Sequence, residues 1–111
     1  MKRLQEYQHL LATDGVEWGL IGPRETERLW ERHIDNCLAV TEDPLCLPQG
    51  ATVLDVGSGA GLPGLVWAIA RPDLKVTLVE PLERRVRFLE QAADRLEVPV
   101  RVVRARIQDV D

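Results

Sequence analysis

A glycine-rich turn constrains the fold of this chain more than any other feature of its sequence. The segment VLDVGSGAGLPG, from Val53 to Gly64, is an apolar run that ends in closely spaced glycines and leads into a second apolar stretch. Gly57, Gly59 and Gly61 permit backbone dihedrals and close approaches that a side chain would block. The segment therefore predicts a strand that passes through a turn into a helix, with a ligand able to lie directly on the main chain of the turn.

The C-terminal part of the chain alternates between strand and helix patterns. Apolar runs rich in Val, Leu and Thr predict buried parallel strands at about residues 52–56, 75–80 and 100–104. Helical patterns between these runs predict helices at about residues 63–70 and 82–96. This order predicts an α/β fold of the form βαβαβ, with a parallel sheet and right-handed crossovers.

A helical segment is predicted to precede the sheet. Apolar residues at helical spacing indicate a first helix over about residues 2–13, and a second helix is expected over about residues 24–41. The proline- and glycine-containing stretch EDPLCLPQG follows as a linker. We therefore expect an N-terminal helical segment, residues 1–48, and a ligand-binding segment, residues 49–111.

Composition and charge exclude several function classes. A net charge of −4 provides no global basic field for nucleic acid, so any RNA contact must be local. The sequence contains neither a long apolar run nor a signal peptide, which predicts a cytoplasmic protein without a membrane contact. Cys37 and Cys46 lack a CxxC spacing and neighbouring histidines, which favours free thiols over a disulfide or a metal site.

Two acidic residues narrow the choice of ligand. Gly59, Gly61 and Gly64 also match the GxGxxG pattern of dinucleotide enzymes, so the glycines alone indicate only a nucleotide-like ligand. Asp55 would repel a pyrophosphate, whereas S-adenosyl-L-methionine has no phosphate and carries an ammonium and a sulfonium. Glu80 ends the second strand, about 20 residues past the turn, where a carboxylate accepts ribose hydroxyls. The alternatives are a solvated strand-end glutamate and a purely structural turn.

The pattern from Asp55 to Gly61, DxGxGxG, resembles motif I of class I methyltransferases. The sequences GLPG, RPD and VEPLERRVRFLEQ, together with the upstream GLIGPRE and ERLWERHIDNCLAV, resemble the RsmG (glucose-inhibited division protein B) family in its actinobacterial form. The resemblance covers nearly all of residues 15–111. It implies the first half of a class I methyltransferase Rossmann-like sheet, preceded by N-terminal helices. We therefore expect the chain to be truncated at its C-terminus and to be inactive alone.

The resemblance also implies a reaction and a set of contacts. Members of this family transfer a methyl group from S-adenosyl-L-methionine to N7 of a guanosine in 16S ribosomal RNA, so the expected partner is this RNA or the small ribosomal subunit. Guanine N7 carries a free lone pair, so no catalytic acid or base is expected. Besides Asp55 and the three motif glycines, the expected cofactor contacts are Leu62, Glu80, Ile107 and Gln108.

Three arginines follow the second strand and could contact RNA. Arg84, Arg85 and Arg87 form a local basic patch that could hold phosphates. The alternative is a solvated helix face that is balanced by Glu83 and Glu90. The sequence leaves both possibilities open.

Two further residues have open roles. His33 lies within a predicted helix without a recognisable catalytic partner, which favours a packing histidine satisfied by one hydrogen bond over a catalytic one. Trp18 lies in a loop and is either a surface stacking residue or a local packing residue.

Two functions other than methyl transfer are compatible with the sequence. A nicotinamide-dependent oxidoreductase would use a similar turn but is disfavoured by Asp55, and a non-catalytic interaction fragment is compatible with the chain length. The first strand is expected to be an exposed edge, which predicts self-association of the chain.

Overall fold

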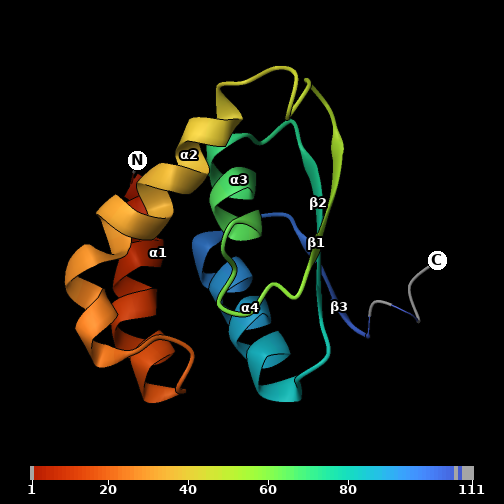
Figure 1. Cartoon of the computed structure of the whole chain (residues 1–111). Helices are drawn as coiled ribbons and strands as arrows, with labels where there is room; N and C mark the ends of the chain where they lie inside the picture. Colours follow the sequence, from red (N-terminus) through yellow and green to blue (C-terminus); the bar gives the residue numbers. More distant parts are fainter. Residues whose placement is uncertain (1, 107, 109–111) are drawn as a thin grey trace.

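The structure is arranged in three layers, of which a parallel sheet is the first. This computed structural model describes residues 2–106 and 108. The sheet has the order β1-β2-β3 and consists of β1 (Thr52–Val56), β2 (Lys75–Glu80) and β3 (Arg101–Arg104). Helices α3 (Gly64–Ala70) and α4 (Glu83–Leu96) connect the strands and cover one face of the sheet (Figure 1). The predicted βαβαβ fold is confirmed, with element ends within a residue of those expected.

The two faces of the sheet have different environments. β1 pairs in parallel with β2 in a register from Thr52 opposite Lys75 to Val56 opposite Val79. Successive side chains of a strand point to opposite faces, and Val53 packs against the core under the helices. Leu54 and Val56 are 49% and 44% exposed, so among the described residues no helix covers this part of the other face.

The N-terminal helices form the third layer, on the outer side of α3 and α4 (Figure 1). Helix α1 (Lys2–Leu10) continues into a π-helical turn, η1 (Leu11–Gly15), which agrees with the first predicted helix. One hydrophobic core joins this layer to the rest of the chain. It includes Leu4, Tyr7 and Leu11 from the N-terminal helices and Leu65 and Leu89 from α3 and α4.

The prediction of one continuous α-helix over about residues 24–41 is wrong. It consists of a 3₁₀ helix, η2 (Pro23–Arg28), a π-helical segment, η3 (Leu29–Ile34), and the α-helix α2 (Asp35–Thr41). Leu29 and Ile34 are both fully buried. In an α-helix, residues five positions apart point in different directions, whereas the wider π-helical turn brings them toward one face. The π-helical turn thus places both buried side chains on the side that faces the core.

Arg71 joins the linker after α2 to the start of β2. Its Nη1 donates to the carbonyl oxygens of Thr41 at 3.0 Å and Leu47 at 3.1 Å, and its Nε and Nη2 donate to Asp73 at 2.8 and 2.7 Å. Asp73 Oδ2 also accepts the N–H of Gly50 at 2.8 Å. The Arg71 guanidinium holds the pKa of Asp73 well below its usual range. Arg71 and Asp73 of the RPD motif thus hold both ends of the linker against the start of β2.

Other features bear on the excluded classes. Cys37 and Cys46 are free thiols. Across residues 2–106 and 108, no group of His, Cys, Asp and Glu side chains has a metal-binding arrangement. In the same residues, every helix is too short or too polar to cross a bilayer.

Candidate functional site

The turn after β1 lies at the end of the sheet where β2 finishes and α4 begins (Figure 1). The N–H groups of Gly57 and Ser58 both donate to the carbonyl oxygen of Val79, at 2.8 and 3.2 Å. The N–H of Gly61 then donates to the carbonyl oxygen of Ser58 at 2.7 Å. These bonds fix the path of the turn against β2, as required for a preformed binding surface.

The glycines of the turn fall into two pairs. Gly57 and Gly59 have φ values of +74° and +56°, and a Cβ atom on Gly57 would meet no heavy atom within 4 Å. A Cβ on Gly59 would lie 3.9 Å from its nearest neighbour, the Gly57 carbonyl oxygen. By contrast, a Cβ on Gly61 or Gly64 would collide with core side chains, among them Leu65. The first pair therefore leaves the main chain open to a ligand, and the second pair permits close packing.

Glu80 is positioned beneath this open main chain. Its side chain is only 1% exposed. Oε1 accepts the N–H of Gly59 at 3.1 Å, and Oε2 accepts the N–H of Leu82 at 2.8 Å, just before α4. Nη1 of Arg85 lies 3.7 Å from Oε1. The carboxylate therefore ties the turn to the start of α4, and a ribose would have to share or replace the bond to Gly59.

Asp55 is turned toward the helices and not into open solvent. Its Oδ2 accepts the N–H of Gly64 at 3.0 Å, and its carbonyl oxygen accepts the hydroxyl of Ser58 at 2.8 Å. Burial raises the pKa of Asp55, although the hydrogen bond from the Gly64 N–H opposes that rise. The arrangement gives a carboxylate behind the turn whose negative charge is poorly hydrated, and a nearby cation would stabilise it.

Tyr7 supports the turn from α1, a contact that the sequence did not predict. Its hydroxyl donates to the carbonyl oxygen of Ala60 at 2.6 Å, and the side chain is completely buried. Burial raises the pKa of Tyr7 well above its ordinary value, and the charges of Cys37 and Asp55 add to the effect. Leu4, Tyr7 and Leu11 lie at helical spacing, which indicates that Tyr7 belongs to the apolar face of the first helix. Nothing in the sequence indicates its partner 53 residues away.

The remaining predicted cofactor contacts lie on either side of this turn. Leu62 is half-buried within the turn. Gln108 is exposed and lines a hollow of about 440 Å³. The other residues of the hollow are Arg104 at the end of β3 and residues that follow β2 and β3, namely Pro81, Ala105 and Arg106. Ile107 lies outside the described residues. The hollow adjoins the strand end that carries Glu80, since Pro81 follows it directly.

The three arginines of the predicted basic patch do not form one surface. Arg84 and Arg87 are exposed, and Arg87 pairs with Glu83 at 3.0 Å. Arg85 is instead directed at Glu80, and its Nε is a buried atom without a partner among the described residues. Helical spacing contains the signal for this difference, because Arg85 lies 4, 7 and 11 residues before the buried Leu89, Ala92 and Leu96, on the same face of α4.

Neither His33 nor Trp18 belongs to the glycine turn. His33 is half-buried and has no hydrogen bond in the described part of the chain, so the expected single hydrogen bond is not found. It lines a separate hollow on the N-terminal helices with Arg24, Arg28 and Arg32. Trp18 packs edge-to-face against Phe88 and is only partly buried. The packing role is thus confirmed, and the surface stacking role stays a prediction.

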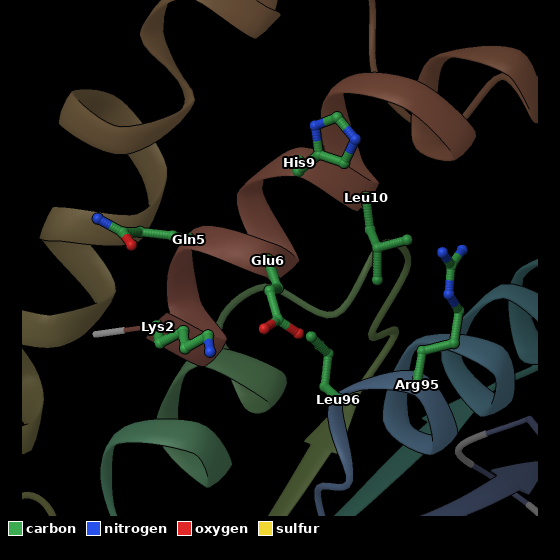
Figure 2. A pocket seen from close by; sticks show the side chains of 7 residues that line it. All are labelled: Lys2, Gln5, Glu6, His9, Leu10, Arg95 and Leu96. Carbon is green, nitrogen blue, oxygen red and sulfur yellow. The ribbon is translucent and has the colours of Figure 1, made fainter.

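A larger hollow lies elsewhere, between α1 and the C-terminal end of α4. Figure 2 shows Glu6 and Leu10 of α1 near Arg95 and Leu96 of α4, which line the hollow together with Lys2, Gln5 and His9. This hollow has a volume of about 510 Å³ and mixes basic and acidic side chains. It contains none of the residues predicted to bind a cofactor, so its size does not identify the functional site.

The chain is similar to one protein family over its whole length. The family model described as "GidB: rRNA small subunit methyltransferase G" matches residues 1–111. The chain is 63% identical over 106 residues to the ribosomal RNA small subunit methyltransferase G of Salinispora arenicola, covering 94% of this chain and 43% of that protein. It is 57% identical over 107 residues to the protein of that name from Thermobifida fusca, covering 96% and 44%. The chain thus spans about two fifths of the length of these curated relatives.

Proposed function

Because the chain belongs to the rRNA small subunit methyltransferase G (GidB) family, we propose that it forms the S-adenosyl-L-methionine-binding part of an enzyme that methylates N7 of a guanosine in 16S ribosomal RNA. Residues 49–111 would bind the cofactor, and residues 1–48 would support the binding turn from behind. The partner would be the RNA itself or the small ribosomal subunit, in the cytoplasm. The observation that carries the proposal is the open main chain at Gly57 and Gly59, flanked by two carboxylates.

The residues present fit the cofactor. The open main chain at Gly57 and Gly59 lets an adenosine group approach closer than any side chain would allow. Glu80 offers carboxylate oxygens with further lone pairs for ribose hydroxyls. Gln108 and the hollow that it lines would hold the adenine edge. When bound, S-adenosyl-L-methionine supplies a methyl group on a positively charged sulfur.

Asp55 accounts for the preference for a cationic cofactor. Its partly buried carboxylate behind the turn favours a nearby ammonium and disfavours a pyrophosphate. This is the property that separates the proposed cofactor from a nicotinamide dinucleotide. The same hydrogen bond to Gly64 that holds Asp55 in place also fixes the start of α3.

The proposed reaction needs alignment more than acid or base chemistry. Guanine N7 attacks with its own lone pair, so no proton has to be removed first. The chain's own residues would hold and orient the reactants in a site that suits a dispersing positive charge. The deep major groove of an RNA helix hides N7, so the substrate would be a loop or a splayed nucleotide.

The test uses two glycines with nearly the same positive φ. Gly57 and Gly50 have φ values of +74° and +72°, and a Cβ atom on either would meet no heavy atom within 4 Å. A Gly57→Val change and a Gly50→Val change therefore cost similar backbone strain, about 1–3 kcal/mol each. Only the first places a side chain over the open main chain at Gly57 and Gly59, which is the proposed cofactor cradle.

Calorimetric titration with S-adenosyl-L-methionine and with a nicotinamide dinucleotide provides the measurement. We expect the protein at the relatives' full length to prefer the methyl donor, Gly57→Val to remove this binding, and Gly50→Val to keep it. Equal affinity of the two variants, or preferred binding of the dinucleotide, would refute the proposal. Mass spectrometry of 16S ribosomal RNA after incubation with the protein at the relatives' full length then tests the methylated position.

A further inference from the structure

We propose that the hollow between the loop after η1 and the first turns of α4 binds one unpaired RNA nucleotide. The base would stack on Trp18, and the adjoining phosphates would be held by Arg84 and Arg87. The inference rests on the proposed RNA substrate and adds a subsite for a nucleotide other than the one that is methylated. The hollow has a volume of about 360 Å³ and is lined by Trp18, Glu83, Arg84 and Arg87.

The position of the hollow suits a neighbouring nucleotide. It contains no residue of the glycine turn, so it is separate from the cofactor cradle. It nevertheless lies at the same end of the molecule, because the loop after η1 and the start of α4 are both at the end where β1 and β2 finish (Figure 1). Its size is within the range of small-ligand sites, about 300–1,000 Å³.

Trp18 is held in place before any ligand binds. Its ring packs against Phe88 with centroids 6.1 Å apart and an interplanar angle of 63°. Its backbone N–H donates to the carbonyl oxygen of Asp14 at 2.8 Å, and the backbone N–H of Leu20 donates to the carbonyl oxygen of Gly15 at 2.8 Å. Phe88 itself is buried, so the indole is anchored from the core while it also lines the hollow. A rigid aromatic ring binds a base at low cost in conformational entropy.

The charges around the hollow fit a phosphate backbone. Arg84 is exposed and has neither a hydrogen bond nor an ion pair in the described part of the chain. Arg87 pairs with Glu83 at 3.0 Å, but both side chains are more than half exposed, so this pair is weak and can be exchanged. Because the net charge of the chain is −4, binding here depends on these local cations.

An aromatic ring beside two guanidinium groups favours a nucleotide over a simple anion. A free phosphate would use the arginines without Trp18, whereas an unpaired nucleotide uses both the ring and the charges. Base stacking tolerates any base, so the subsite would recognise an unpaired strand and not a particular sequence. Double-stranded RNA hides its base faces and would lose the contact with Trp18.

The experiment measures fluorescence anisotropy of a labelled single-stranded RNA oligomer of about ten nucleotides with the 111-residue chain. We expect Trp18→Leu to weaken binding roughly 5- to 100-fold and Trp18→Phe to retain most of it. Arg84→Ala should weaken binding and reduce the slope of log K against log salt by about 0.7. Arg95→Ala, at the other end of α4, is the matched arginine control and should have little effect. A duplex of the same RNA should bind more weakly than the single strand.

The outcomes separate this proposal from the proposed function. S-adenosyl-L-methionine affinity, measured by calorimetry on the same variants of the protein at the relatives' full length, should be the same in all of them. If the chain binds the methyl donor but Trp18→Phe and Trp18→Leu bind RNA as the parent chain does, the subsite proposal is wrong and the proposed function stands. If RNA binding depends on Trp18 but the methyl donor is not bound, the proposed function is wrong and the subsite proposal stands. A loss with Arg95→Ala equal to that with Arg84→Ala, or no binding of RNA, also overturns the subsite. Should Trp18→Leu fail to fold, tryptophan fluorescence provides the second measurement. RNA should quench the fluorescence of the parent chain, and this quenching should disappear in Trp18→Phe; if it persists unchanged, the subsite proposal is wrong.

Discussion

Replacing Tyr7 by phenylalanine removes one hydrogen bond that ties the N-terminal helix to the glycine turn. The hydroxyl of Tyr7 donates to the carbonyl oxygen of Ala60 at 2.6 Å, and the ring stays in a fully buried site that phenylalanine also fills. A hydrogen bond of this type contributes about 1 kcal/mol net, and an unsatisfied buried partner costs about 1–3 kcal/mol. Ala60 is only partly buried, so water can reach its carbonyl group in part. We therefore expect the free energy of unfolding to fall by about 1–2 kcal/mol.

The assay is urea unfolding followed by circular dichroism, with Thr13→Val as the matched control. The Thr13 hydroxyl donates to the carbonyl oxygen of His9, four residues earlier, at 2.8 Å, and this bond is exposed. Its loss therefore removes no contact with the glycine turn. The control should change stability by less than about 0.5 kcal/mol. Calorimetry with S-adenosyl-L-methionine should show weaker binding to Tyr7→Phe than to Thr13→Val. If the two variants behave alike in both measurements, the bond to Ala60 does not support the turn.

The pH dependence provides an independent check. Burial raises the pKa of Tyr7 in the folded chain, so the folded state binds the phenolic proton more tightly than the unfolded state does. The resulting stabilisation is present below the unfolded pKa of about 10 and is lost as the pH rises toward the folded pKa. The stability difference between the parent chain and Tyr7→Phe should therefore narrow above pH 10, by about 1.4 kcal/mol per pH unit. Tyr7 is the only tyrosine, so tyrosinate absorbance reports it directly.

Two further predictions concern Asp55 and the exposed face of the sheet. Burial raises the pKa of Asp55, so its contribution to stability is present below about pH 3.8 and is lost as the pH rises through the folded pKa. Asp55→Asn keeps an acceptor for Gly64 and should raise the urea midpoint at pH 7 while weakening S-adenosyl-L-methionine binding about tenfold or more; a lower midpoint would contradict the reasoning. The exposed Leu54 and Val56 on edge strand β1 predict self-association, which Leu54→Lys should reduce in sedimentation velocity; a monomeric parent chain would rule this out.

The sheet could be predicted from the sequence because its signals are local and consistent. Runs of Val and Leu, bounded by glycines and Arg71-Pro72, fix both the type and the ends of the strands. The second N-terminal helix could not be predicted in the same way. Its buried residues Leu29 and Ile34 are five positions apart, and only the tertiary core determines that both must face inward.

Side-chain directions within the site were the least predictable part. Arg84 and Arg85 are adjacent in sequence and chemically identical, yet one is exposed and the other is directed at Glu80. The 100° step between neighbouring helical residues separates them, and the buried residues of α4 show which of the two lies nearer the core. The contact between Tyr7 and Ala60 leaves no such trace, because a partner far along the chain is set by the packing of whole helices.

The structure of the glycine turn explains why its sequence pattern alone does not identify the ligand. The patterns DxGxGxG and GxGxxG overlap in this segment, and both count glycines without regard to why each is needed. In the structure, Gly61 and Gly64 are required because a Cβ atom would strike the core, whereas Gly57 and Gly59 have space above them. Any fold that packs a helix closely on a strand would need the former pair, so that pair carries no information about the ligand. The latter pair, with Asp55 behind it, is the part that can distinguish a cationic nucleoside from a pyrophosphate.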